Sequence, residues 1–586
     1  MSTIPRPEYP RPQFFRDSWL NLNGSEWSYE FDFGQSGVAR GLCASKGFSK
    51  SINVPFCPES ELSGVGYTDF IPAMFYHRKL AIPEEWGGKR VLLNFGAVDY
   101  ECEGFINGAS VGCHRGGSSS FSFDLTNYVA AGNEYDFVLR VKDDVRSGIQ
   151  ASGKQSVNYA SSGCHYTRVT GIWQTVWLEA VALTGLKRCR ITPDWDNGAF
   201  TFTPEYWADP CDCRLRIQTD AEGKQAACGE FKAVSGVSHV LPVSIRRDWS
   251  PDDPFLYDII LELLDADNNV IDRVSSYAGL RKIEVSGKRV FLNGVELFQR
   301  LVLDQGFYPD GIWTAPSDEA LKRDIMLSQA AGFNGARLHQ KVFEERFHYW
   351  ADKLGYLTWG ETPSWGAAFL GVGGTGALSR ENYWQGAYNF SNEWREIVLR
   401  DVNHPSIIVW TPANETATGA NLADYRHIMR ELYMLTKDLD PTRPVNDTSG
   451  YYHVKSDLWT VHLYTGSAAE LETQLCPAGA EVYSRPEDYG YCGQPYLLDE
   501  FGGFGYVPPE RKLYSERSWS YYGFERMEEV LTKISEQVDI VIKHGLAGYC
   551  YTQLTDVEQE ENGIYNYDRS EKFPMDKIRE IFLRRP

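Results

Sequence analysis

Short apolar runs alternate with helical stretches through the second half of the chain, and this pattern constrains the fold most. From about residue 282 onward, eight runs have the length and apolar character of buried strands. They lie at 297–303, 333–338, 356–359, 407–410, 445–447, 458–462, 496–498 and 547–552. Helical stretches fall between them at 318–331, 344–354, 393–402, 422–438 and 527–543. Repeated βα units of this kind predict a parallel sheet closed into a TIM barrel.

The preceding residues have a different pattern, with short alternating runs and no long helical period. Runs such as 89–95 and 135–141 are separated by turns rich in Gly, Asn and Asp, and Asn107-Gly108 is a strong hairpin signal. This pattern is typical of antiparallel β-sandwiches. We predict three domains: a jelly-roll sandwich at 1–181, an immunoglobulin-like sandwich at 182–281 and the barrel at 282–586.

Two glutamates stand directly after predicted barrel strands. Glu415 follows the fourth strand and Glu500 follows the seventh. Because the carboxyl ends of parallel strands meet at one face of a barrel, both side chains should line the same mouth. Cleavage of an acetal needs two carboxyl groups, one that protonates the leaving oxygen and one that attacks or stabilises the sugar centre. Asp499 should face the opposite side of its strand and pair with an Arg or Lys.

The segment 403–415, NHPSIIVWTPANE, resembles the catalytic signature of family 2 glycoside hydrolases. The segments 76–80, 105–108, 116–125 and 171–179 look like that family's sugar-binding jelly roll, and 249–257 resembles its immunoglobulin-like domain. The resemblance covers the chain in three-domain order. It implies a retaining exo-β-glycosidase with Glu415 as acid/base and Glu500 as nucleophile, without a metal or cofactor. In that role the pKa of Glu415 should be raised by burial and by the second carboxylate.

The resemblance and the strand positions suggest further substrate-binding residues. Asn414 would hold the sugar 2-hydroxyl, and the Tyr464 hydroxyl would donate to Glu500. Arg337 resembles the family arginine near the nucleophile, although a barrel-lining salt bridge is nearly as good an interpretation. The remaining candidates are His339 after strand two, Asp304 and Glu361 where hydroxyl-binding carboxylates would sit, His462 as core or glycone contact, and Trp365 on a Gly-rich loop. That loop is predicted to run from 362 to 391 and to carry Trp384 as well, with simple packing the safer interpretation of both tryptophans.

Several departures from the family pattern bear on the sugar. The segment 303–305, LDQ, stands where β-galactosidases and β-glucuronidases of the family carry Arg-His-Glu, and 339–341, HQK, replaces His-Tyr-Pro. The Asn-x-Lys element of β-glucuronidases is replaced by 566–569, NYDR, where Asp568 would repel a carboxylate and Arg569 is the available cation. We therefore rank neutral glycosides first and expect β-galactosidase activity. A β-glucuronide, β-galactofuranoside, α-arabinoside or β-glucoside is the alternative glycone.

Bulk properties exclude some other classes. The formal net charge of -21 disfavours nucleic acid and anionic membranes as partners. The 12 cysteines contain no CxxC pair and are expected to be mostly reduced thiols. No signal-peptide pattern opens the sequence and no apolar run would span a bilayer, which predicts a cytoplasmic protein. The resemblance implies a carbohydrate or glycoside as the partner, and homo-oligomers are common among enzymes of that family. A non-catalytic carbohydrate-binding protein on the same scaffold is the competing class, and a structural sandwich protein would leave the strand-end glutamates unexplained.

Overall fold

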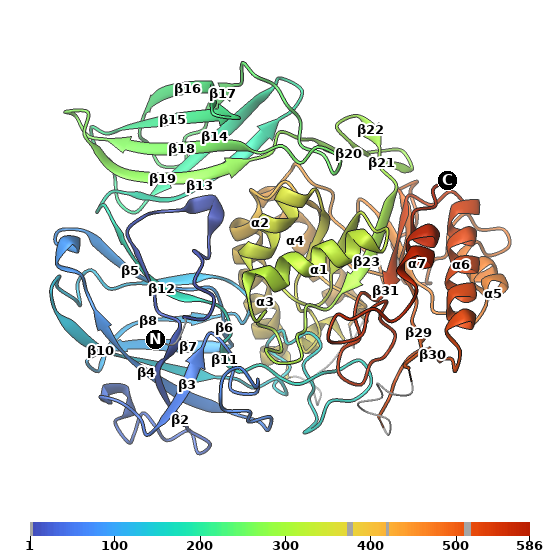
Figure 1. Ribbon diagram of the computed structural model, residues 1–586, viewed down its shortest axis with the longest axis horizontal. Coiled ribbons are helices and arrows are strands. Elements are labelled where there is room, and N and C mark those ends of the chain that lie inside the picture. The colour runs from blue at the N-terminus through green and yellow to red at the C-terminus, as the bar shows by residue number, and fades with distance from the viewer. Residues whose placement is uncertain (1–3, 372–378, 418–420, 509–516) are drawn as a thin grey trace.

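The computed structural model describes residues 4–371, 379–417, 421–508 and 517–586. Figure 1 shows three bodies: an N-terminal sandwich in blue, a second sandwich in cyan and green, and a region of strands and helices that runs from yellow-green to red. The predicted fold class, a jelly-roll domain, an immunoglobulin-like domain and a TIM barrel, is confirmed in this order. The described residues contain no helix long and apolar enough to cross a membrane.

The first body is a sandwich of two antiparallel sheets. One has the order β1-β12-β5-β9 and the other the order β3-β2-β4-β10-β7-β8, with β11 and β6 as an additional pair. The strands are β1 Trp19–Asn21, β2 Gly24–Phe31, β3 Lys50–Val54, β4 Ala73–Ala81, β5 Arg90–Phe95, β6 Val98–Asp99, β7 Glu101–Ile106, β8 Ala109–Arg115, β9 Phe121–Asp124, β10 Glu134–Lys142, β11 Gly171–Ile172 and β12 Val176–Val181. Large apolar side chains such as Trp27, Phe95 and Leu139 fill the space between the sheets.

The second body packs a three-stranded sheet, β13-β14-β17, against a four-stranded sheet, β16-β15-β18-β19. Its strands are β13 Leu186–Asp194, β14 Ala199–Tyr206, β15 Arg214–Ala221, β16 Lys224–Lys232, β17 His239–Pro242, β18 Tyr257–Leu264 and β19 Val270–Ala278. Burial alternates strictly along β15, as expected for a strand with one face on the core. A small sheet of β20 Ile283–Ser286, β21 Arg289–Leu292 and β22 Val295–Glu296 leads into the barrel.

The barrel strands form one parallel sheet in the order β26-β25-β24-β23-β31-β28-β27. They are β23 Gln299–Asp304, β24 Gly335–Leu338, β25 Leu357–Glu361, β26 Ile407–Thr411, β27 Trp459–His462, β28 Tyr496–Gly502 and β31 Gly548–Thr552. The predicted fifth strand at 445–447 is not a regular strand. It is joined to β26 by an isolated bridge between Trp410 and Val445, so this segment fills the place between β26 and β27 irregularly.

Seven α-helices are described around the barrel strands: α1 Asp318–Ala330, α2 Glu345–Leu354, α3 Arg380–Asp401, α4 Leu422–Leu439, α5 Ala468–Leu475, α6 Met527–Lys543 and α7 Met575–Phe582. Short 3-10 helices lie at Pro12–Phe14, Leu42–Ala44, Glu84–Trp86 and Ala368–Leu370, and β29 Phe504–Gly505 pairs with β30 Tyr522–Gly523. The predicted loop from 362 to 391 is wrong in its second part. Ser379 caps α3 by accepting a hydrogen bond from Asn382 N, so the helix begins at Arg380.

A segment of the first domain reaches the barrel mouth. The backbone N–H groups of Ser152 and Gly153 donate to Trp365 O at 2.8 and 3.0 Å. Gly153 has φ +59, and a Cβ there would lie 2.4 Å from Gln340 O. Only glycine tolerates both this conformation and this close approach. The N-terminal domain therefore supplies part of the wall of the barrel mouth.

Candidate active site

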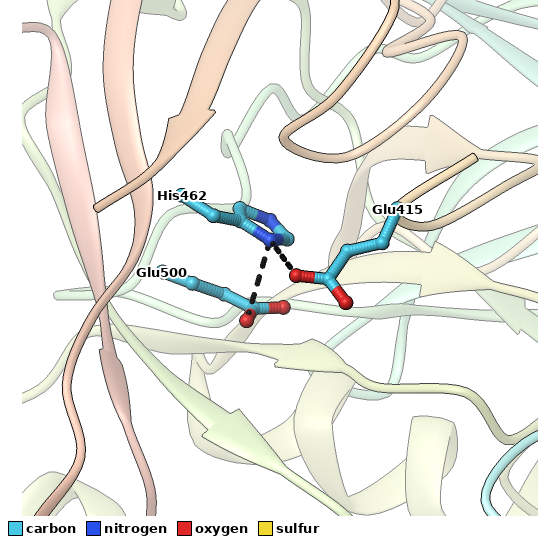
Figure 2. A group of neighbouring side chains, drawn as sticks. All are labelled: Glu415, His462 and Glu500. Carbon is cyan, nitrogen blue, oxygen red and sulfur yellow. Dashed lines mark hydrogen bonds and ion pairs between the residues drawn. The ribbon is translucent and has the colours of Figure 1, made fainter. Parts of the chain in front are cut away.

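The two predicted catalytic glutamates lie together at the barrel mouth. Glu415 follows the end of β26 and has φ +46, an uncommon left-handed conformation for a non-glycine residue. Glu500 belongs to β28 and is buried. One carboxylate oxygen of each glutamate and a ring nitrogen of His462 all lie within 4.8 Å of one another. Figure 2 shows the imidazole ring facing both carboxylates.

His462, from the end of β27, lies between the two glutamates. Its Nδ1 is 2.7 Å from Glu415 Oε1 and 3.4 Å from Glu500 Oε2 (Figure 2). On the other side of the ring, Nε2 is 3.0 Å from Ser449 Oγ and 3.5 Å from Asp499 Oδ1. Burial alone would lower the pKa of His462, but the charges of Glu500 and Asp499 and hydrogen bonds to Asp499 and Glu415 raise it to about 10. The ring is therefore a cation at neutral pH, and it belongs to the site rather than to the core.

The expected rise in the pKa of Glu415 is wrong for the free protein. Burial does act to raise this pKa, but the hydrogen bond and the charge of His462 outweigh it, with help from Lys154 and Arg337. The net shift is downward, so Glu415 is ionised and the proton between the two side chains resides on His462. The second carboxylate can be recognised from the sequence, but the charge of His462 beside Glu415 arises only in the folded site.

Arg337, at β24, organises the other side of the site. Its Nη2 donates to Glu500 Oε1 at 2.6 Å and to Asn414 Oδ1 at 2.9 Å. Nε donates to Glu361 Oε2 at 2.9 Å, and Nη1 donates to Asp499 O at 2.9 Å. The side chain is fully buried. Arg337 thus lies beside the predicted nucleophile. Both interpretations of this residue, as a salt bridge that lines the barrel and as a contact of the nucleophile, hold at once, because it forms buried ion pairs with Glu361 and with Glu500.

The second oxygen of Glu500 is held by Tyr464. The hydroxyl donates to Glu500 Oε2 at 2.7 Å and is 2.8 Å from Thr552 Oγ1. The ring stacks on Tyr521 with centroids 3.5 Å apart and an interplanar angle of 5°. Both oxygens of Glu500 therefore accept hydrogen bonds from protein donors, which fix the orientation of the carboxylate.

Among the described residues, Asn414 has a side-chain nitrogen free to bind a substrate, whereas both carboxylate oxygens of Glu361 already accept hydrogen bonds from the protein. Asn414 Nδ2 is buried with no hydrogen-bond partner among the described residues, while its Oδ1 is held by Arg337. This free amide is consistent with the predicted contact to a sugar hydroxyl. Glu361 accepts from Arg337 through one oxygen and from Gln340 N at 3.0 Å through the other. Burial raises the pKa of Glu361 to about 7, and its hydrogen bonds assign it to the support of Arg337.

His339 also contacts Arg337 rather than standing alone. Its Nδ1 is 2.5 Å from Arg337 Nη2 and 3.2 Å from Glu361 Oε1. Burial, followed by the charge of Arg337, holds the pKa of His339 well below its usual value, so the ring is neutral. A neutral ring whose Nδ1 accepts from Arg337 carries its proton on Nε2.

The Asp304 carboxylate is not joined to this network by any hydrogen bond or ion pair between described residues, and only its backbone oxygen takes part, by accepting from His339 N at 2.9 Å. Its Oδ1 accepts from Gly306 N at 2.9 Å. Burial and the charge of Asp324 raise its pKa to about 6, opposed by Arg569 and Lys341. Trp365 lies in the mouth region, with its ring 5.3 Å from that of His165. Trp384, predicted on the substrate-wall loop, is instead part of α3.

Strict alternation fails at Asp499. The pairing of β28 with its neighbours shifts register after Leu498, which is typical of a β-bulge. Asp499 Oδ2 accepts from Ser449 Oγ at 2.5 Å, and its Oδ1 faces His462. The expected basic partner is present as Arg337, at a longer 3.9 Å. The bulge lets consecutive carboxylates both face the histidine.

Three further residues at the site were not predicted from the sequence: Lys154, Ser449 and Tyr521. The Lys154 ammonium lies 4.3 Å from the centroid of the Trp365 ring. Ser449 hydrogen-bonds to His462 and Asp499, and Tyr521 stacks on Tyr464. Each reaches the site from a loop, and Lys154 comes from a different domain, so no strand-end position marks them in the sequence.

The trio of Glu415, His462 and Glu500 has a spacing that could also hold a metal ion. A metal would have to displace the proton on His462 Nδ1, because a protonated ring nitrogen has no lone pair to offer. The same proton accounts for the short contact with Glu415. The arrangement fits proton transfer beside an ionised carboxylate.

Comparisons with known proteins agree with this geometry. The model of the family 2 glycosyl hydrolase TIM-barrel domain matches residues 281–502, that of the family's sugar-binding domain matches 61–178, and a third family 2 model matches 190–281. The chain is 24% identical over 542 residues to a β-glucuronidase of Paenibacillus borealis, covering 86% of each chain. It is also 24% identical to a β-galactosidase of Thermoanaerobacter pseudethanolicus, where it covers 59% of the relative's length.

Solved structures show the same fold over nearly the whole chain. The β-glucuronidase of Ruminococcus gnavus superimposes with a TM-score of 0.78 at 17% identity, covering 99% of this chain and 100% of the other. A β-galacturonidase of Eisenbergiella tayi gives a TM-score of 0.72 at 20% identity, with 98% of each chain covered. Together with the three domain matches, these findings establish that the chain belongs to glycosyl hydrolase family 2 and is a glycoside hydrolase.

Proposed function

We propose that this protein is a retaining exo-β-glycosidase that works by double displacement. The main support is the short distance between the two glutamates, which have carboxylate oxygens within 4.8 Å of one another. Retaining enzymes place their carboxyl groups about 5–5.5 Å apart, whereas inverting enzymes need about 6.5–9.5 Å to admit a water. The short separation supports direct attack by one carboxylate on the anomeric carbon.

In the first step Glu500 attacks the anomeric carbon and forms a glycosyl-enzyme. Arg337 and Tyr464 hold its two oxygens in place by donating a hydrogen bond to each. The free amide of Asn414 is placed to hold the sugar 2-hydroxyl, a contact that strengthens in the transition state. These contacts position the nucleophile before the substrate arrives.

The leaving oxygen takes its proton from Glu415. In the free protein that proton is on His462 Nδ1, 2.7 Å from Glu415 Oε1. It moves along this hydrogen bond to Glu415 and then to the leaving group. Formation of the ester removes the charge of Glu500, which lowers the pKa of His462. Once the leaving group has taken the proton, His462 is neutral and Glu415 is a carboxylate. In the second step Glu415 takes a proton from water and returns it to His462.

Exo action is the mode that the family resemblance implies. The segment around Gly153 forms one wall of the mouth, where it packs against Trp365 and Gln340. The sequence ranks a β-galactoside first, and the other glycones named above remain alternatives. A non-catalytic binding protein is disfavoured, because sugar binding alone does not require a proton held beside a second carboxylate.

Initial rates on a panel of chromogenic glycosides test this function. The panel contains the β-galactoside, β-glucoside, β-glucuronide, β-galacturonide, β-galactofuranoside and α-arabinoside. We expect turnover on at least one, and the variant Glu500→Gln should remove nearly all of it. Glu472→Gln, on the barrel surface, is the matched control and should retain wild-type rates. Normal turnover by Glu500→Gln would refute the nucleophile assignment.

A further inference from the structure

Lys154 is a buried cation whose charge is not neutralised by a direct partner. The residue is 6% exposed. Its ammonium lies over the ring of Trp365, and among the described residues no hydrogen bond or ion pair reaches Nζ. Burying an ammonium without a paired anion is costly, and structures rarely retain one without a use for it. The unpaired ammonium therefore suggests that a ligand supplies the anion.

The backbone holds this side chain firmly in place. Lys154 O accepts from Tyr166 N at 2.8 Å, and the two preceding residues donate to Trp365 O. Trp365 is fixed in turn by its own N–H, which donates to Gln340 Oε1 at 3.1 Å. The ammonium is thus carried by a braced segment at the barrel mouth and not by a loose surface loop.

Lys154 lies close enough to the catalytic centre for its charge to interact with the groups there. The groups whose charges act on it are Cys164, Glu560, Glu500 and Glu415, and it acts in turn on the rings of His339 and His165. Glu560 is engaged by the hydroxyl of Tyr166 and by Asn562. The catalytic glutamates already have closer donors in Arg337 and His462. None of these carboxylates forms an ion pair with Lys154, so its positive charge remains available to a substrate.

Arg569, the cation that the sequence suggested for binding a carboxylate, is already paired within the protein. Arg569 is buried, and its guanidinium donates to both oxygens of Asp324 and to the backbone oxygens of Phe307 and Tyr567. These contacts satisfy it within the protein. The barrel residue that stands nearest to the family's carboxylate-binding position therefore has a structural role, and Lys154 is the buried cation left facing the site.

We propose that Lys154 binds the carboxylate of a uronic-acid glycone, so that the substrate is a β-glucuronide or β-galacturonide. This inference rests on the proposed glycosidase function and reverses the preference for neutral sugars drawn from the sequence. An ammonium against an aromatic wall, beside carboxylates with partners of their own, is suited to a single anionic group on a sugar. The two uronides share this carboxylate and differ at C4, which the sugar panel separates.

The test compares matched sugars. Values of kcat/KM are measured for β-glucuronide against β-glucoside and for β-galacturonide against β-galactoside, with the wild type, Lys154→Met and Lys154→Arg. The wild type should prefer a uronide. Lys154→Met should lower kcat/KM for that uronide by about 10²-fold, the usual effect of removing one partner of a buried charge pair, and should lower the uronide-to-neutral ratio accordingly. Lys154→Arg should recover part of the ratio. Lys79→Met, an exposed lysine of the same domain, is the control.

The outcomes separate the two proposals. An equal loss on uronide and neutral substrates in Lys154→Met would mean that the lysine acts only through Trp365 or through its charge on Glu415, and it would overturn the carboxylate site. Turnover of neutral glycosides with none of uronides would do the same while leaving the catalytic pair intact. If no glycoside is turned over, the glycosidase proposal fails, and calorimetric titration with free D-glucuronate, D-galacturonate, glucose and galactose still tests Lys154. Uronates that bind the wild type no better than the neutral sugars would refute it.

Discussion

Glu415 and Glu500 are chemically identical side chains whose roles are separated by their neighbours. Glu500 accepts from Arg337 and Tyr464, and Glu415 accepts from His462. The sequence identifies both glutamates because each follows a strand. It does not identify the charge of His462, because that charge depends on Asp499 and Glu500, which come together with it only in the folded barrel.

A leaving-group test distinguishes the roles. Glu415→Gln removes the proton donor but leaves Glu500 intact. We expect kcat/KM to fall about 10²–10⁴-fold for a glycoside with a poor leaving group, and much less for a dinitrophenyl glycoside that needs no protonation. Steady-state rates on the two aglycones measure this. Equal losses on both would show that Glu415 is not the general acid.

Buried Glu59 gives a prediction about stability. Its Oε2 accepts from Thr170 N at 3.2 Å, and its Oε1 is buried without a partner among the described residues. Burial raises its pKa from 4.5 to about 8. Between these pH values the folded protein binds a proton that the unfolded chain has lost, so the free energy of unfolding falls as pH rises.

Glu59→Gln removes this titration while keeping the shape of the side chain. Relative to wild type, its free energy of unfolding should improve progressively from pH 4.5 to 8 and then level off. The total gain should be a few kcal/mol, because each pH unit in this range contributes about 1.4 kcal/mol. Urea unfolding at several pH values measures the difference. A difference that stays constant with pH would contradict the raised pKa.

At the scale of elements, strands and long helices could be predicted from periodicity, and the irregular parts could not. The run at 445–447 looks like a strand but makes only an isolated bridge to β26, because its partners are supplied by loops. Helix α3 begins at Arg380, well before its apolar pattern becomes clear, since Ser379 caps it. The bulge in β28 turns Asp499 toward His462, and no alternation rule anticipates it.

The turn after Ser449 tests how closely the elements must pack around His462. Gly450 has φ +84, and a Cβ there would lie 2.2 Å from His462 Cδ2. Gly450→Ala should displace the ring from Glu415 and lower kcat by about 10²-fold, because misplacement of a catalytic group by about 1 Å has effects of this size. Gly479→Ala, a positive-φ glycine with open space around it, controls for backbone strain. Similar kcat values in the two variants would contradict the packing argument.

At the scale of the whole molecule, the domains are joined by buried charged residues as well as by the segment around Gly153 that packs on Trp365. Arg6 from the N-terminal extension donates to Glu344 of the barrel at 2.8 Å and to Glu8 at 2.7 Å. Ser118 N of the first sandwich donates to Glu393 of α3 at 2.8 Å. Such contacts between residues hundreds of positions apart cannot be predicted from one sequence, although the order of the domains could.

Arg6→Leu should therefore destabilise the joined domains. It leaves Glu344 buried without its cation, a change that typically costs about 3–5 kcal/mol. Arg188→Leu breaks an ion pair with Glu205 in which the two side chains are 41% and 37% exposed, and it should cost at most about 1 kcal/mol. Thermal unfolding of both variants measures the contrast. Equal melting temperatures would show that the Arg6 contact contributes nothing to the assembly of the domains.

In the proposed mechanism Glu500 attacks the sugar and Glu415 transfers the proton. The most direct test is to incubate the protein with an activated 2-deoxy-2-fluoro glycoside of the glycone that the panel selects, and to locate the adduct by peptide mass spectrometry. The account predicts one sugar per chain, attached to Glu500, and no adduct in Glu500→Gln. An adduct on Asp499 or Glu415, or labelling that persists in Glu500→Gln, would contradict it.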